Sequence, residues 1–289
     1  MGDFVTDEPM KKHCSWRTGG VARLFFRPSD QADLSRFLTH LDKNEAILWL
    51  GLGSNLLVRD GGFDGVVISL KGRINAIQVN ADKITIESGC SCAKAAREAA
   101  RAGLVGLEFL AGIPGTIGGA LKMNAGAFGG ETWQTVEHVE IMSREGQIHQ
   151  ADKTNFKIGY RHIEGLKTDE FFIRATFQLK KGDVKKAQQR IQDLLAVRAK
   201  TQPIGELSCG SVFKNPPNQF AAALIEDCGL KGKRQGGAVV SEKHANFIIN
   251  QNQASASDIE TLIQLVQATV HKEKGVLLQA EVQIVGEAR

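Results

Sequence analysis

Several features that would set this chain apart from ordinary globular enzymes are missing. Cysteine is sparse, with five residues, an odd number, and no CxxC spacing. No apolar run reaches the roughly 18 residues that suggest a membrane-spanning helix, and the first residues, MGDFVTDEPMKKHCSW, contain no apolar signal segment. These absences argue against a disulfide framework, a metal site and membrane insertion. They predict a cytoplasmic protein with reduced thiols.

The chain also has no large excess of charge of either sign. The 36 Lys and Arg residues oppose 32 Asp and Glu residues, which gives a net charge of +4, and no run of five like charges occurs. The sequence therefore gives no support for nucleic-acid binding, and it implies no protein partner. The mild positive charge suits an anionic small molecule. At 289 residues, the chain is long enough for two or three compact units.

Glycine, by contrast, is abundant, with 31 residues. Seven of them fall in residues 107–131, LEFLAGIPGTIGGALKMNAGAFGGE. Flexible linkers are usually polar, and this stretch is apolar. Glycine permits positive φ and removes the Cβ that would block a close approach. We therefore predict a buried turn system whose backbone approaches another group closely.

A second glycine loop, GLGSN at residues 51–55, follows an apolar strand predicted at residues 46–50. It begins like a dinucleotide-binding fingerprint, but Leu56 stands where the third glycine should be, and the following LLV reads as a strand. Successive N–H groups in such a turn can bind an anion, although a simple tight turn explains the same residues. The presence of two such loops supports a pyrophosphate site more strongly than either loop does alone.

Strands and helices are mixed along the chain, which indicates an α/β or α+β fold. Helical periodicity and capping residues predict helices at residues 31–41, 91–102, 182–200, 220–228 and 257–274. Strands are predicted at residues 23–27, 46–50, 56–58, 84–88, 136–143, 147–150, 171–179, 245–250 and 278–285. Residues 201–205 read as a linker before a smaller unit.

Three places carry candidate chemistry, each with a plainer alternative. Tyr160, the only tyrosine, precedes Arg161; this pair suits an anion or a developing negative charge, but a surface pair looks the same. Ser211 lies in SCGSVFKNP, which is not a GxSxG elbow, and it is a proton donor, a nucleophile or part of a polar turn. Glu281 suits acid–base chemistry if it faces a cleft. If its strand faces solvent instead, no such role is implied. His244 is expected to be structural.

Eight motifs occur in a fixed order along the chain. They are RTGG (17–20), LGLGSNLLV (50–58), LAGIPGTIGGALKMNAGAFGGE (110–131), GYR (159–161), CGSVFKNP (209–216), GLKG (229–232), KHANFIIN (243–250) and AEVQIVG (280–286). Together they resemble the UDP-N-acetylenolpyruvoylglucosamine reductase family, flavoenzymes of peptidoglycan precursor synthesis. The resemblance runs from about residue 13 to residue 286.

The resemblance implies an α+β fold: an FAD-binding module of the vanillyl-alcohol-oxidase (PCMH) type in two subdomains, followed by a smaller substrate domain. The expected boundaries are 1–70 and 71–200 for the two subdomains and 201–289 for the α+β substrate domain. The residues expected to bind FAD are Gly51, Leu52, Gly53, Ser54, Asn55, Gly112, Ile113, Pro114, Gly115, Thr116, Gly118, Gly119, Asn124 and Gly126.

The same resemblance implies a reaction. NADPH would reduce FAD, and a hydride would pass to C3 of the enolpyruvyl group of a UDP-sugar, UDP-N-acetylglucosamine enolpyruvate. Protonation at C2 would give UDP-N-acetylmuramate. By position in the motifs, Ser211 would be the proton donor, and Arg161 and Glu281 the other catalytic residues. The residues expected to contact the substrate are Tyr160, Lys214 and Asn215.

Two departures and two alternatives complete the prediction. Cys209 stands where alanine is common in the family, and Ala280 where proline is common. With Tyr160 as its only tyrosine, the chain resembles members that lack an extra tyrosine-bearing loop. A related FAD oxidase acting on another alcohol or ether is the alternative enzyme. A non-catalytic flavin-binding protein is the third possibility, which the Ser, Lys and Glu motifs disfavour.

Overall fold

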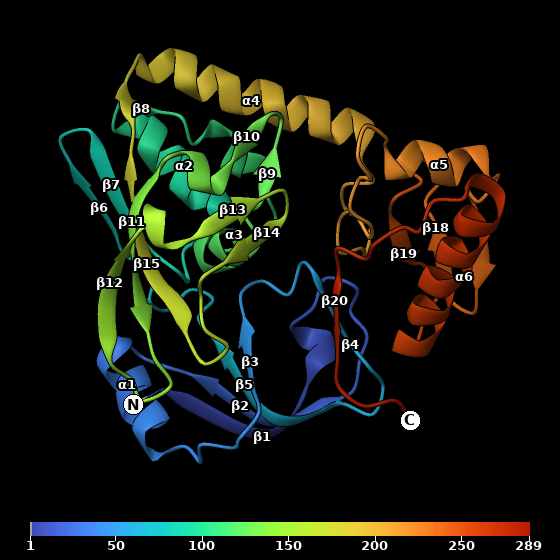
Figure 1. Ribbon diagram of the computed structural model, residues 1–289, viewed down its shortest axis with the longest axis horizontal. Helices are drawn as coiled ribbons and strands as arrows, with labels where there is room; N and C mark the ends of the chain where they lie inside the picture. The colour runs from blue at the N-terminus through green and yellow to red at the C-terminus, as the bar shows by residue number, and fades with distance from the viewer. Residues whose placement is uncertain (1) are drawn as a thin grey trace. The chain divides into compact units, whose positions relative to one another are not determined.

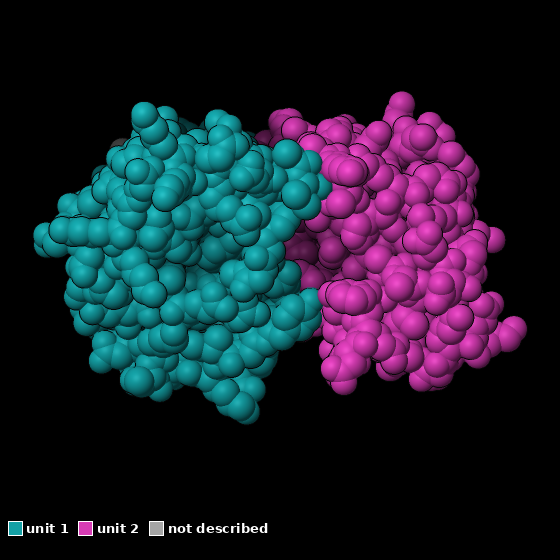
Figure 2. Space-filling view, turned by 90° about the horizontal axis from the view of Figure 1, so that it is seen from above, with its two compact units in different colours: residues 1–5, 25–52, 67–198 teal, residues 6–24, 53–66, 199–289 magenta. Residues whose placement is uncertain are grey.

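The computed structural model describes residues 2–289, which form two compact units. Figure 2 colours them. Unit 1 contains residues 2–5, 25–52 and 67–198, and unit 2 contains residues 6–24, 53–66 and 199–289. The boundary divides the strands β1 (Asp3–Pro9), β2 (Val21–Arg27) and β5 (Phe63–Ser69), which join β3 (Ile47–Leu50) in a sheet of order β1-β2-β5-β3. It also divides the GLGSN loop between Leu52 and Gly53.

The centre of unit 1 is a five-stranded antiparallel sheet of order β12-β11-β15-β7-β6. Its strands are β12 (Ile148–Asp152), β11 (Val136–Met142), β15 (Phe171–Gln178), β7 (Lys83–Glu87) and β6 (Ile77–Asn80). Helices α2 (Cys92–Arg101) and α3 (Ile117–Lys122) lie beside it (Figure 1). Alternating residues Ile84 and Ile86 are fully buried, as the period of a strand with one covered face requires.

All five predicted helices are present, with ends within two residues of the prediction. They are α1 (Gln31–His40), α2, α4 (Val184–Thr201), α5 (Ala221–Asp227) and α6 (Ala256–Lys274). Their N-terminal caps explain the agreement: Asp30 Oδ1 accepts from Asp33 N at 2.8 Å, and Ser91 Oγ accepts from Lys94 N at 3.3 Å. No helix within residues 2–289 has the length and apolar character needed to cross a bilayer.

The glycine-rich stretch is more regular than the predicted turn system. It contains a 3₁₀ helix (Glu108–Gly112), the helix α3, and a hairpin of β9 (Gly126–Ala127) and β10 (Gly130–Glu131). The prediction of turns is therefore wrong for α3. Glycine has a low helix propensity, so the sequence did not predict this helix, which is stabilised by burial of Ile117 and Leu121. At Gly118, an added Cβ would come within 2.9 Å of Ser88 Cβ, so the glycine permits this packing.

Unit 2 combines α5 and α6 with a small sheet of order β17-β18-β19 (Figure 1). The three strands are β17 (Arg234–Gln235), β18 (Ala238–Val240) and β19 (Ile248–Asn250). Helix α6 begins with a capping box between Ser255 and Asp258 and ends at Gly275, whose φ is +68°. Residues Leu262 and Val266 of α6 are buried in the core of this unit.

The last strand is shorter than predicted. Only β20 (Gln283–Val285) is a strand, and it pairs in parallel with β4 (Leu56–Val58). The prediction of a strand over residues 278–282 is wrong because this segment instead bonds irregularly to residues 212–214, with a single bridge between Phe213 and Ala280. The remaining short strands are β8 (Leu104–Val105), β13 (Lys157–Gly159), β14 (His162–Glu164) and β16 (Lys180–Lys181).

Candidate functional site

The two glycine loops touch each other within unit 1. The first loop follows β3, and the second, residues 112–116, leads into α3. A Cβ added to Gly51 would lie 2.6 Å from Thr116 Oγ1. Thr116 is 3% exposed, so its side chain lies against the first loop. This contact fits the prediction that the loops form one site.

The second half of the first loop belongs to unit 2. Gly53 has φ +64°, and its carbonyl accepts a hydrogen bond from Ser15 N at 3.0 Å. A Cβ at this position would collide with the carbonyl oxygen of His13. The loop also contacts the thiol of Cys209, whose Sγ lies 3.5 Å from Leu56 O and 3.7 Å from Gly53 O. Because of the positive φ and the collision with His13, only glycine fits at position 53 of the loop.

Asn55, at the end of the loop, contacts the segment that carries Glu281. Its Nδ2 donates to the carbonyl oxygen of Glu281 at 3.0 Å, and its own carbonyl accepts from Gln283 N at 3.0 Å. The side-chain amide of this predicted FAD ligand is thus engaged by the protein.

Ser211 and Glu281 lie on hydrogen-bonded neighbouring segments of unit 2. Glu281 N donates to the carbonyl oxygen of Val212 at 2.7 Å, and Lys214 N donates to that of Gln279 at 2.9 Å. Both Ser211 and Glu281 are half-buried. The structure therefore brings together the main-chain segments that carry two predicted catalytic residues, which are 70 positions apart in the sequence.

The predicted substrate contact Asn215 also has a local role, because its Oδ1 accepts from Ala221 N at 3.0 Å, at the start of α5. Lys214, one position earlier, is half-buried.

Arg161 lies in unit 1, at the tip of the hairpin formed by β13 and β14. Its φ is +52°, a conformation that arginine rarely adopts. Its Nη2 donates to the carbonyl oxygen of Gly126 at 2.8 Å, and its guanidinium carbon lies 5.1 Å from the ring centroid of Tyr160. Tyr160 itself is 47% exposed. The GYR motif is thereby fixed to the end of the glycine-rich stretch.

Asn124 fixes the same region from inside. It is fully buried, and its Nδ2 donates to Gly159 O at 2.9 Å and to Glu131 Oε2 at 3.0 Å. Its Oδ1 accepts from Trp133 N at 3.2 Å, and its φ is +44°. Its amide is therefore used to join the glycine-rich stretch to the GYR hairpin.

Replacing Asn124 with alanine is expected to lower the free energy of unfolding by roughly 3–5 kcal/mol, because Gly159 O and Trp133 N–H lose their partner and alanine resists this φ. Asn124→Gly loses the same hydrogen bonds but tolerates the φ, so it should lose about 1 kcal/mol less. Urea unfolding of the two variants measures both terms. Wild-type stability of Asn124→Ala would contradict the role of the amide.

Comparison with known proteins identifies the family. The family described as "UDP-N-acetylenolpyruvoylglucosamine reductase, C-terminal domain" matches residues 202–285, and an FAD binding domain family matches residues 22–152. A reductase of this name from Alkalilimnicola ehrlichii is 51% identical over 100% of this chain and 96% of its own. One from Legionella pneumophila is 52% identical over 99% of this chain and 94% of its own.

The chain belongs to the UDP-N-acetylenolpyruvoylglucosamine reductase family.

A solved structure of the family supports the fold. The crystal structure of the reductase from Thermus caldophilus matches with a TM-score of 0.84 and 33% identity, over 98% of each chain. The predicted α+β class, with an FAD-binding module and a reductase-type C-terminal domain, is confirmed. So are the predictions of an FAD-containing oxidoreductase and of FAD as the cofactor.

The loops have the chemistry to hold FAD phosphates. Gly119, at the start of α3, is exposed, and an added Cβ there would meet only Thr116 Oγ1, at 3.9 Å. Within unit 1, main-chain N–H groups of the loops and the hydroxyl of Thr116 are donors of the kind that suits a pyrophosphate. The N–H of Gly118 is already bonded to Ser88 O at 3.0 Å, so this glycine supplies room rather than a donor.

The other predicted FAD contacts lie on the same loops. Gly115 is bonded within the protein, with its N donating to Ile113 O and its carbonyl accepting from Cys92 N, each at 2.9 Å. A Cβ on Gly112 would come 2.7 Å from the ring of Phe128. Leu52 and Ile113 are half-buried, and Pro114 is exposed. These residues shape the loops, and their contacts with FAD stay a prediction.

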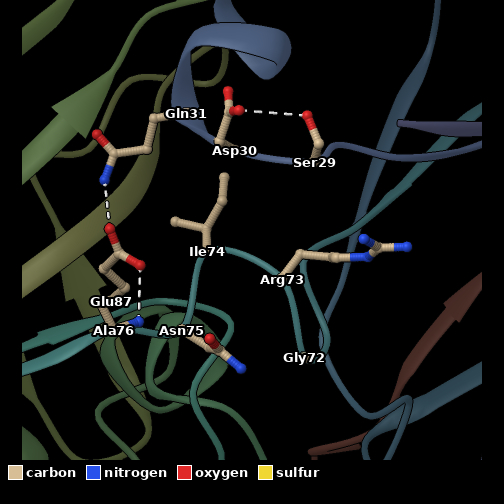
Figure 3. Close-up of a pocket in the computed structure, with 9 residues that line it drawn as sticks. All are labelled: Ser29, Asp30, Gln31, Gly72, Arg73, Ile74, Asn75, Ala76 and Glu87. Atoms are coloured by element: carbon tan, nitrogen blue, oxygen red, sulfur yellow. Dashed lines mark hydrogen bonds between the residues drawn. The ribbon is translucent and has the colours of Figure 1, made fainter. Parts of the chain in front are cut away.

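A hollow of about 310 Å³ in unit 1 is separate from these residues (Figure 3). Glu87 lies at its edge, where its Oε1 accepts from Gln31 Nε2 and its Oε2 from Ala76 N, each at 2.7 Å. Its other lining residues come from the start of α1 and from residues 72–76. None of the predicted site residues lines this hollow.

Within residues 2–289, no group of three His, Cys, Asp or Glu side chains could hold a metal.

One residue that contacts the site was missed by sequence reasoning. The side chain of Asn246, in the KHANFIIN motif, bonds to both polar main-chain atoms of Phe213, two positions after Ser211. A signal existed, because an asparagine stands between His244 and a buried apolar run, where an amide needs internal partners.

Proposed function

We propose that this enzyme reduces UDP-N-acetylglucosamine enolpyruvate to UDP-N-acetylmuramate with NADPH. The family assignment supports a reductase of peptidoglycan precursor synthesis. The observation that carries the finer proposal is the pairing of the Ser211 segment with the Glu281 segment, through Glu281 N and Val212 O at 2.7 Å. This pairing supports the proposal because the main-chain segments that carry the hydroxyl and the carboxyl group adjoin, and acid–base work needs both groups near the reacting carbon.

The chemistry that FAD would supply, when held by the two glycine loops and reduced by NADPH, is a hydride for C3 of the substrate. The task of the protein is then to complete the reduction at C2. The Ser211 O–H bond breaks, a C2–H bond forms, and the serine regains a proton from solvent. A serine hydroxyl is a weak acid, so it acts only against a strongly basic carbon and from a fixed position.

The remaining residues act on charge and binding. As electrons move toward the substrate carboxylate, a cation near it lowers the barrier, and we assign this role to Arg161. Its contact with Gly126 O holds its guanidinium in place. Glu281 stabilises the enol form of the substrate, and Tyr160, Lys214 and Asn215 contact the substrate.

The proposal includes the predicted layout of residues 1–70 and 71–200 around FAD and residues 201–289 around the substrate. The family matches at residues 22–152 and 202–285 support it. The only partners it needs are the UDP-sugar and NADPH. We assign the reaction to the cytoplasm, where the five free thiols are expected to stay reduced.

A visible spectrum of the purified protein tests the proposal. We expect flavin bands that bleach on addition of NADPH and return on addition of the enolpyruvyl nucleotide. Rapid oxygen consumption with simple alcohols, and no response to the nucleotide, would instead favour a related oxidase. A protein that takes up no FAD would overturn the proposal.

A further inference from the structure

A single buried amide holds the main chain beside Ser211. Asn246 is 3% exposed. Its Oδ1 accepts from Phe213 N at 2.9 Å, its Nδ2 donates to Phe213 O at 2.8 Å, and its carbonyl accepts from Val212 N at 2.9 Å. The two residues that follow Ser211 therefore make three hydrogen bonds to one residue.

The opposite edge of the same segment is bonded to the Glu281 segment. Val212 O accepts from Glu281 N at 2.7 Å, and Phe213, which is 2% exposed, is anchored in the core of unit 2. Asn246 thus supplies hydrogen bonds to one edge of this segment, as a neighbouring strand would, and residues 279–282 supply hydrogen bonds to the other edge. With both edges fixed, the main chain at Ser211 has little freedom to shift relative to Glu281.

We infer that Asn246 is a positioning residue for Ser211, which sets the hydroxyl in register with Glu281 for protonation of the substrate. The inference rests on the proposed function, in which Ser211 is the proton donor. Since a weak acid must be held close to the carbon it protonates, a displacement of about 1 Å can slow a reaction by roughly 100-fold.

Asn246→Asp is the sharpest variant because it keeps the shape and the acceptor for Phe213 N. It replaces the donor Nδ2 with an oxygen that faces Phe213 O. Asn250→Asp is a matched control. Asn250 is also buried, and its Nδ2 donates to Trp16 O at 2.7 Å while its Oδ1 accepts from Ala254 N at 2.7 Å. The control loses the same kind of bond elsewhere in unit 2.

The two half-reactions of the FAD-loaded enzyme are followed by stopped-flow absorbance, together with the melting temperature and the Kd of the oxidised enzyme for the enolpyruvyl nucleotide. In Asn246→Asp we expect the nucleotide-driven return of flavin colour to slow by roughly 10- to 100-fold. Bleaching by NADPH and nucleotide affinity should change by less than about twofold. Asn250→Asp should lower the melting temperature similarly and leave both half-reactions near wild type.

A double variant isolates the coupling to the serine. If Asn246 acts through Ser211, Asn246→Asp adds no further slowing to Ser211→Ala. Equal slowing of both half-reactions in Asn246→Asp, or additive slowing in the double variant, would overturn the inference. Should Asn246→Asp fail to fold, Asn246→Ser and Asn250→Ser are compared in the same way.

The inference and the function on which it rests fail differently. Slowing in Ser211→Ala with a normal rate in Asn246→Asp would overturn the positioning role alone. A normal rate of colour return in Ser211→Ala would overturn the proton-donor role, and the positioning role with it.

Discussion

Ser211→Ala should slow the nucleotide-driven return of flavin colour by roughly 10²- to 10⁴-fold, the range expected for loss of a positioned general acid. Bleaching by NADPH should continue at nearly the wild-type rate, because the serine is assigned no part in that step. The side chain is half-buried on a segment held from both edges, so its removal leaves the main-chain hydrogen bonds of Val212 and Phe213 in place. Stopped-flow absorbance of each half-reaction measures the difference.

Ser208→Ala provides the control for this experiment. It removes the same atom from the same loop, three residues before the proposed donor, from a side chain that is also half-buried. Both of its half-reactions should stay within about twofold of wild type. If Ser208→Ala slows the return of colour as much as Ser211→Ala does, the effect belongs to the loop and Ser211 is not the donor.

Gly53→Ala should lower the free energy of unfolding by roughly 2–5 kcal/mol, from the left-handed backbone and from overpacking together. The φ of Gly53 is +64°, and its Cβ would collide with the carbonyl oxygen of His13 and lie 2.9 Å from Cys14 Cα. Backbone atoms cannot turn aside as a side chain can, so the loop itself must move. The purified variant should therefore also carry less FAD, which absorbance shows directly.

Gly72→Ala separates the two causes. Gly72 has φ +69°, but an added Cβ there meets nothing within 4 Å. It should lose only about 1 kcal/mol, the conformational part of the effect, and retain FAD. Equal losses of stability for the two variants in urea unfolding would show that crowding at Gly53 does not matter.

The sequence predicted most reliably those elements whose signals are local. Helices α2 and α6 have capping serines and a steady apolar stripe, so both were predicted within one residue of their ends. Edge strands such as β6, with the sequence IQVN, were missed because three of the four residues are exposed and have no burial pattern. Helix α3 was missed for the opposite reason, since its glycines resemble a loop although packing makes them helical.

Candidate site residues could be predicted from the sequence, but which of them lie close together in the fold could not. Ser211 and Glu281 adjoin through irregular main-chain pairing with a single bridge at Phe213 and Ala280, which leaves no periodic signal. The predicted regular strand at this place was wrong for the same reason. Asn246 joins the group through an amide whose partners are main-chain atoms, and those partners have no side-chain identity from which to recognise them.

The thiol of Cys209 bears on the design of covalent inhibitors. It lies two residues from the proposed proton donor, so an electrophile attached to a substrate mimic could be designed to react with it. Burial raises its pKa to about 12, and its Sγ lies against the carbonyl oxygens of Gly53 and Leu56. Since the thiolate is the reactive form, fewer than about one such thiol in ten thousand is ionised at neutral pH. An inhibitor of this reductase should therefore gain its affinity from non-covalent contacts, such as those proposed for Arg161 and Lys214 with the substrate, rather than from a bond to sulfur.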